Sequence, residues 1–459
     1  GLLLHAAADR ELQVRRTYMV LGFAALLVGA VVSLLPIRGP VGTWFLPQGF
    51  LCMTGALLFL LAFLRNETEE QIRQITLYTL GGAGAVLALV GLVGGHLDTW
   101  YNVAPKLLLP YFLLLSLLGL LYLWAFVAFQ GVNTELGYWA GVGLGAVGLL
   151  CFVAAVVRGV FMPLMARWEW ITPPPAYNMP YGLTLMGLGL LYVALCAGLC
   201  SDNQLIVLTR RELASLFFSP IAYVILLGLT LIAWFMFMQF IFSFLYSIQG
   251  TQQVVVLPVP EPMIIGYIVD WFPIICLIFM VPVLTMRLLS EERRTGTLEM
   301  LLTVPTNETM VVLSKFLAVF IFFMLAWLPW AMFPVALRVV GGNPFDYRPL
   351  IGFFLVLACI GSSFLSMGLF FSSLTQDQMA AAIVTFVGMV ALTLIYFVRR
   401  LLGDTYPNAH AILGHVSYVN LLIEVLQGKL APRDLLFWLS STVFWLMLTV
   451  LRLNVRKWW

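Results

Sequence analysis

The sequence predicts an all-α integral membrane protein with about twelve membrane-spanning helices, arranged as two halves of six. Hydrophobic residues make up 62% of the chain and charged residues only 10%, whereas soluble domains contain about 45–50% and 25%. Apolar runs recur along the whole chain, and many approach the roughly 20 residues that a helix needs to cross a bilayer. These runs lack strand-like alternation, and inside lipid a helix satisfies its own backbone hydrogen bonds. The fold class therefore follows from composition, run length and the absence of alternation.

The apolar runs form two sets of six, separated by a polar break at residues 201–204. The first set comprises residues 18–35, 44–64, 76–95, 107–130, 138–165 and 180–199, and the second comprises residues 221–248, 263–288, 310–338, 351–374, 379–398 and 437–452. We therefore predict one six-helix membrane domain over residues 1–200, whose role the sequence leaves open, and another over residues 221–459. In the first domain, Gly141 and Gly145 have the spacing that lets two membrane helices approach closely.

Residues 201–220 predict an amphipathic helix that connects the two domains. Arg210, Arg211 and Glu212 lie among apolar residues at helical spacing, which favours a position in the plane of the membrane interface. Ser219 and Pro220 follow, in the order typical of an N-cap and a first helical residue. We therefore expect this connecting helix to lead directly into a membrane span.

The densest charge cluster of the chain lies in the link between the second and third spans of the second domain. Its central residues are Glu291, Glu292, Arg293, Arg294, Gly296, Thr297, Leu298 and Glu299. Gly296 permits a sharp turn, and Thr297 is placed to cap a short helix with an apolar face that Pro305 bounds. From the residues alone, two interpretations stay open: a docking element for a soluble partner, or a solvated loop that only fixes the topology.

Three parts of the second half resemble ABC transporter type 2 permeases, most closely the gliding-motility and copper-processing branch of that family. The first is Arg211-Glu212-Leu213 followed by Ser219-Pro220-Ile221-Ala222-Tyr223, and the second is the segment 291–305. The third comprises Gly428, Asp434 and the last apolar span, which ends in Arg456-Lys457. The resemblance covers about residues 205–459. The first six spans depart from the family pattern, and the resemblance assigns them no role.

The resemblance implies an ABC type 2 exporter fold for the second domain, with six spans preceded by an in-plane connecting helix. It also implies that the chain is the permease subunit of an ATP-driven exporter. Two permease copies, or this chain and a homologous permease, would pair, and each would dock a separate ATPase. Residues 291–299 would then face the ATPase and transmit its closure to the spans, and residues 412–426 would form a re-entrant element at the external exit.

The chain carries no phosphate-binding loop, so we expect it not to be an enzyme. That loop requires Gly-x-x-x-x-Gly-Lys-Ser/Thr, and of the lysines only Lys429 follows a glycine, with Ile423 and Leu430 at the positions of the other required residues. We therefore expect no cofactor on this chain, and ATP and Mg²⁺ on the partner ATPase.

Basic residue pairs predict the orientation of the spans. With both termini in the cytoplasm, Arg15-Arg16, Arg210-Arg211, Arg293-Arg294 and Arg456-Lys457 all lie on the inner side, and only Arg399-Arg400 lies outside. Lys and Arg are enriched in cytoplasmic loops. Together with the resemblance, this pattern predicts a multi-pass protein of the bacterial cytoplasmic (inner) membrane.

Other candidate sites are weaker. Arg158 and Asp270 are ionisable residues within or near spans, for which roles at helix ends are the main interpretation. His410 and His415 are five residues apart, a poor helical spacing for a metal, and we expect no metal site. The net charge of +3 gives no indication of nucleic-acid binding. The alternatives to the permease are a non-transporting scaffold and a subunit of a larger energy-converting or motility complex; ion translocation would require a chain of ionisable residues across the membrane.

Overall fold

The computed structural model is helical throughout the part of the chain that it describes, without a strand in that part. The described residues are 12–34, 42–66, 69–94, 105–130, 135–157, 165, 168, 182–250, 271–296, 307–341, 348–402, 406–427 and 429–456. Eight helices within them are long and apolar enough to cross a membrane. The predicted class, an all-α multi-pass membrane protein, is therefore confirmed, while the total of about twelve spans stays a prediction.

The chain divides into two compact units, residues 1–201 and residues 202–459. The helices of unit 1 are α2 (Leu12–Leu34), α3 (Gly42–Asn66), α4 (Glu70–Gly94), α5 (Pro105–Gln130), α6 (Glu135–Val156) and α8 (Gly182–Cys200). They pack mainly as consecutive pairs, α2 with α3, α4 with α5 and α6 with α8.

Glycines bring α6 and α8 into close contact. A Cβ atom added at Gly141 would overlap the sulfur of Cys200, and one added at Gly145 would overlap the sulfur of Cys196. The close approach that the glycine spacing predicts therefore occurs here, and both cysteines act as small packing residues in it. Neither cysteine forms a disulfide in the structure.

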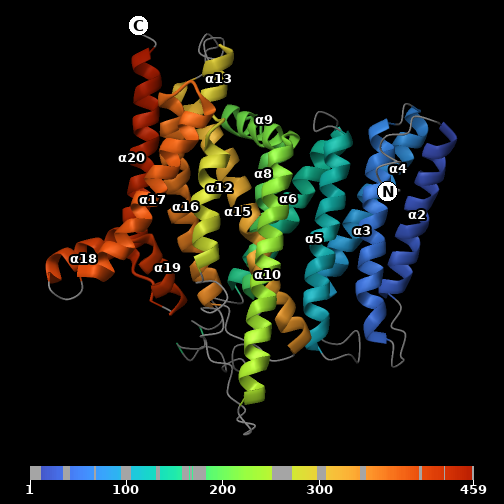
Figure 1. The fold of residues 1–459 in the computed structure, drawn as a ribbon. Helices are drawn as coiled ribbons and strands as arrows, with labels where there is room; N and C mark the ends of the chain where they lie inside the picture. Colours follow the sequence, from blue (N-terminus) through green and yellow to red (C-terminus); the bar gives the residue numbers. More distant parts are fainter. Residues whose placement is uncertain are drawn as a thin grey trace. The chain divides into compact units, whose positions relative to one another are not determined.

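Unit 2 contains ten described helices, six of which contain candidate spans. They are α9 (Gln204–Phe218), α10 (Pro220–Gly250), α12 (Trp271–Thr285), α13 (Ser290–Thr295), α15 (Glu308–Gly341), α16 (Arg348–Leu374), α17 (Gln378–Leu402), α18 (Pro407–Val416), α19 (Tyr418–Leu426) and α20 (Pro432–Arg456). The long helices of this unit lie side by side, and α9 crosses the start of α10 (Figure 1).

The core of unit 2 centres on α15 and α16. Trp327 and Trp330 of α15 are fully buried, with ring centroids 5.0 Å apart. Hydroxyl groups join α16 to α20, because Ser362 bonds to Thr442 and Ser363 to Ser441, each at 2.8 Å. Inside a bilayer such contacts hold helices together where the hydrophobic effect between helices is absent.

The two ends of unit 2 carry different structures. The α13 helix and the junction between α16 and α17 lie at one end, and α18 and α19 lie at the other (Figure 1). Helix α17 runs from the first end to the second, and α20 returns. The charge cluster at α13 and the predicted re-entrant element over residues 412–426 therefore lie at opposite ends of the spans.

Candidate functional site

The predicted charge cluster follows α12 at the end of a candidate span. Helix α12 ends at Thr285, residues 286–289 form a turn, and α13 contains the sequence Ser-Glu-Glu-Arg-Arg-Thr. Two acidic residues open this short helix and two basic residues close it, the arrangement that the helix dipole favours. Gly296 ends it with φ +71°, a left-handed conformation that suits glycine. The sharp turn predicted at Gly296 is thus present.

Hydrogen bonds fix α13 to the end of α16. The backbone N–H groups of Leu289 and Ser290 both donate to the hydroxyl of Ser372, at 3.2 Å each. The guanidinium of Arg293 donates to the backbone carbonyl of Ser373. The start of α13 lacks a side-chain cap of its own, so Ser372 satisfies N–H groups that would otherwise stay unpaired. A displacement of α13 must therefore break these bonds or move the end of α16.

A buried lysine joins α13 to two other helices, α9 and α15. The ammonium group of Lys315 on α15 lies 2.6 Å from a carboxylate oxygen of Glu292 on α13 and 3.1 Å from one of Glu212 on α9. The side chain of Lys315 is only 3% exposed, and those of Glu292 and Glu212 are 19% and 23% exposed. A buried ammonium is tolerated only when paired. The sequence places these three residues far apart, and the fold brings them into one ion-pair cluster.

The α9 helix is seated on the core of unit 2 by its apolar face. Leu213, Leu216 and Phe217 pack against that core, and the ring of Phe217 lies 5.4 Å from that of Phe322 on α15. Arg210 and Arg211 remain exposed, so the helix is amphipathic, as predicted. The next helix starts at Pro220, also as predicted. The Ser219 hydroxyl, however, is buried without a hydrogen-bond partner in the described part, so the side-chain cap predicted there does not form.

The described part of the predicted docking segment extends to Gly296. Arg294, Thr295 and Gly296 form its exposed tip, and Glu291 is half-buried. The predicted short helix that begins at Thr297, including Leu298 and Glu299, lies outside the described residues. The helix that the structure does describe covers the Glu-Glu-Arg-Arg run itself, before the position at which the sequence predicts a helix to begin.

At the opposite end of unit 2, α18 and α19 form a bent pair. Their axes differ by 79° across a break at Ser417. Tyr418 is fully buried, and its hydroxyl lies 2.8 Å from that of Thr393 on α17. His415 contacts Asp434 at the start of α20. These contacts attach the predicted element over residues 412–426 to both neighbouring spans.

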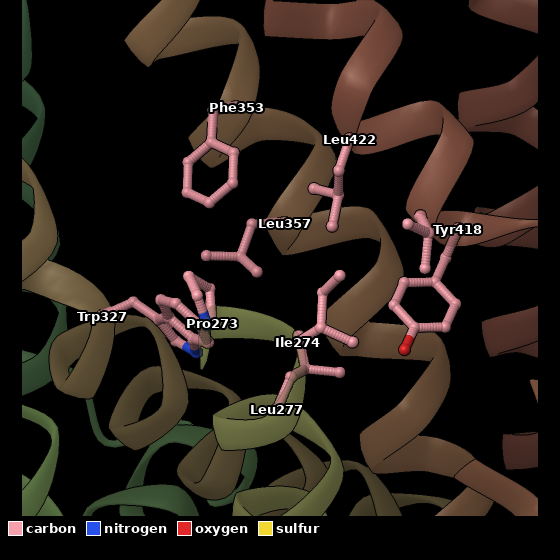
Figure 2. Close-up of a pocket in the computed structure, with 9 residues that line it drawn as sticks. Pro273, Ile274, Leu277, Trp327, Phe353, Leu357, Tyr418 and Leu422 are labelled. Carbon is pink, nitrogen blue, oxygen red and sulfur yellow. The ribbon is translucent and has the colours of Figure 1, made fainter. Parts of the chain in front are cut away.

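The base of this bent pair closes over a small apolar cavity of about 20 Å³. Figure 2 shows Tyr418 and Leu422 of α19 converging with Phe353 and Leu357 of α16 and with Ile274 of α12. The cavity has room for about one water molecule, so apolar side chains fill this end of the unit.

Lys315 and Ser372 are the main residues that the sequence analysis missed. A lysine five residues into the apolar run 310–338 is a signal, because ionisable residues within spans are rarely without a role. Arg158 and Asp270, the ionisable residues that the sequence singles out, lie outside the described residues. Nothing in the local sequence distinguishes Ser372 from the other serines of α16.

Comparison with known proteins gives one match. Residues 252–451 match the family described as ABC-2 family transporter protein. No curated protein and no solved structure matches the chain. The matched range contains α13, Lys315, the cavity at the base of α19 and most of α20.

Proposed function

We propose that the chain is the permease subunit of an ATP-driven exporter, because residues 252–451 of unit 2 match the ABC-2 family transporter protein. ATP hydrolysis would take place on a separate ATPase subunit, with ATP and Mg²⁺ bound there, since this sequence holds no phosphate-binding loop. Transporters of this family normally work with an ATPase partner. The observation that carries the proposal is the ion-pair cluster of Lys315 behind α13.

In this proposal, α13 and the residues after it form the ATPase docking element. The tip at Arg294, Thr295 and Gly296 is exposed at the end of the unit, where a soluble partner has access. The other proposed residues of this element are Glu291, Glu292, Arg293, Thr297, Leu298 and Glu299. Charges of both signs on a short helix favour a partner with complementary charges.

The contacts behind α13 support the coupling step. Lys315 connects α13 to α15 and to α9, and Arg293 connects α13 to α16. A push or pull on α13 would then reach two candidate spans and the connecting helix together. Arg210, Arg211 and Glu212 are proposed as the part of α9 that takes up this movement at the membrane interface.

The remaining assignments follow from the same proposal. The protein lies in the cytoplasmic membrane with both termini and α13 on the cytoplasmic side, and a second permease, identical or homologous, completes the transport path. Residues 1–200 form an additional membrane domain, residues 201–220 the connecting helix and residues 221–459 the permease domain. The bent pair α18–α19 then lies at the external exit.

Purification of the tagged full chain in mild detergent, followed by mass spectrometry of the proteins that copurify, tests the proposal. We expect a stoichiometric ATPase that carries a phosphate-binding loop. The variant Arg294→Glu should reduce its recovery several-fold, because it reverses a charge at the exposed tip. Arg400→Glu, a matched reversal at the other end of unit 2, should leave recovery unchanged. Recovery of the chain without any ATPase would contradict the proposal.

A further inference from the structure

An open groove of about 550 Å³ lies beside α13 in unit 2. The end of α9 and the first turns of α10 form one wall, the last turn of α12 and α13 form another, and α15 lies at the base. All of these helices belong to one compact unit. The groove is therefore a property of the permease unit itself.

The groove combines an apolar wall with charged groups of both signs. Ile221, Ala222 and Ile225 of α10 contribute apolar side chains. Arg287 and Glu291, outside the ion-pair cluster of Lys315, also line the groove. Glu212, Glu292 and Lys315 line it too, and the two carboxylates share the single ammonium group in the ion-pair cluster.

Arg287 and Glu291 form no ion pair or side-chain hydrogen bond with any residue in the described part of the chain. They are nevertheless close in sequence, at the turn before α13 and in its first turn. One cation and one anion that do not pair with each other present two separate charges to a ligand.

The depth of the groove matches the boundary between lipid headgroups and acyl chains. Helix α10, a candidate span, begins at Pro220, and α12 ends at Thr285. Ile225 lies five residues into α10, about 8 Å along the helix axis at 1.5 Å per residue. The charges therefore lie at the end of the spans and the apolar wall one to two turns deeper.

We propose that this groove binds one zwitterionic phospholipid with a primary ammonium headgroup. Its phosphate would accept hydrogen bonds from Arg287, and its ammonium would donate to Glu291. One acyl chain would cover Ile221, Ala222 and Ile225. An anionic phospholipid without an ammonium leaves Glu291 unpaired beside a second negative charge, which costs affinity. The lipid is a resident component of the permease, bound in the absence of an ATPase, so the inference does not depend on the proposed export function.

Native mass spectrometry of the full chain, released from nanodiscs of defined lipid, tests this inference. Nanodiscs contain equal amounts of phosphatidylethanolamine and phosphatidylglycerol, and the ratio of the two retained lipids is measured. We expect phosphatidylethanolamine to be retained preferentially. Glu291→Gln should abolish that preference, and Arg287→Gln should lower retention of both lipids about tenfold, since each would lose a charge-assisted bond.

A matched pair on α10 separates binding from folding. Ile225→Trp fills the apolar wall and should expel the lipid, whereas Leu227→Trp, on an exposed position that does not line the groove, should retain it. Both variants are first checked for an unchanged elution volume in gel filtration. Equal retention of the two lipids by the unmodified chain, or full retention by Ile225→Trp, would overturn the inference. Neither outcome bears on whether an ATPase copurifies.

Discussion

At the scale of single residues, Lys315 decides whether α9, α13 and α15 stay together. Removing its charge leaves the carboxylates of Glu212 and Glu292 facing each other, mostly buried. Breaking one partner out of a buried ion pair costs about 3–5 kcal/mol, and the partial exposure of both carboxylates places this cluster at the lower end of that range. Lys315→Met should therefore lower the midpoint of thermal unfolding in detergent by on the order of 5 °C.

Lys429→Met provides the control for this prediction, because Lys429 is exposed near the start of α20. That change should leave the midpoint within about a degree, as surface substitutions usually do. The triple variant Lys315→Met, Glu212→Gln, Glu292→Gln should recover part of the lost stability, since it removes the two carboxylate charges that repel each other. If Lys315→Met unfolds at the same temperature as the unmodified protein, the cluster does not stabilise the unit.

Residues of this kind show where prediction from sequence ends. The Glu-Glu-Arg-Arg run and Gly296 were recognisable because their charges and conformational freedom are local properties. The partner of Glu292 is Lys315, 23 residues away on another helix, and an unaligned sequence contains no signal for that pairing. The same holds for Ser372, which acts on α13 across a sequence separation of more than 80 residues.

At the scale of helices, the contact between α12 and α16 depends on Gly368, because a glycine has no side chain to hold the helices apart. A Cβ atom added at Gly368 would overlap the Thr285 side chain at the end of α12. Gly368→Ala should therefore destabilise the protein by about 1–3 kcal/mol, as overpacking does. Gly228 on α10 has open space around it, so Gly228→Ala should be neutral or stabilising by up to about 1 kcal/mol. Thermal unfolding of the two variants in the same detergent compares them, and an equal effect of both would refute the packing argument.

Helix positions were predictable where the membrane itself imposes them. Every apolar run overlaps a helix, because a segment without water must bond its own backbone. The break at Ser417 was not predictable in this way, since it contains neither glycine nor proline and Ser417 has an ordinary extended conformation. Burial of Tyr418 and the contact of His415 with Asp434 hold the bend, and both are tertiary contacts.

At the scale of the whole molecule, the same bend decides the topology. Helices α18 and α19 contain 10 and 9 residues, or about 15 Å each, half of the roughly 30 Å hydrocarbon core. Two such helices either enter the membrane and return to the same side, as a re-entrant element, or cross the membrane together as one broken span. Helix α17 runs away from the α13 end of the unit, and α20 runs back to it (Figure 1). We therefore expect α18 and α19 to form a re-entrant element that returns to the side of the membrane from which it enters.

Cysteine labelling with a membrane-impermeant maleimide measures this topology in a background whose six native cysteines are replaced by alanine. Tyr406→Cys and Leu430→Cys, exposed on either side of the bent pair, should both react in intact cells. Gln376→Cys, exposed at the α13 end, should react only in inside-out vesicles. Labelling of positions 406 and 430 from opposite sides would mean a broken span. Labelling of position 376 in intact cells would place α13 outside, where ATP is scarce, and would remove the physical basis for an ATPase docking there.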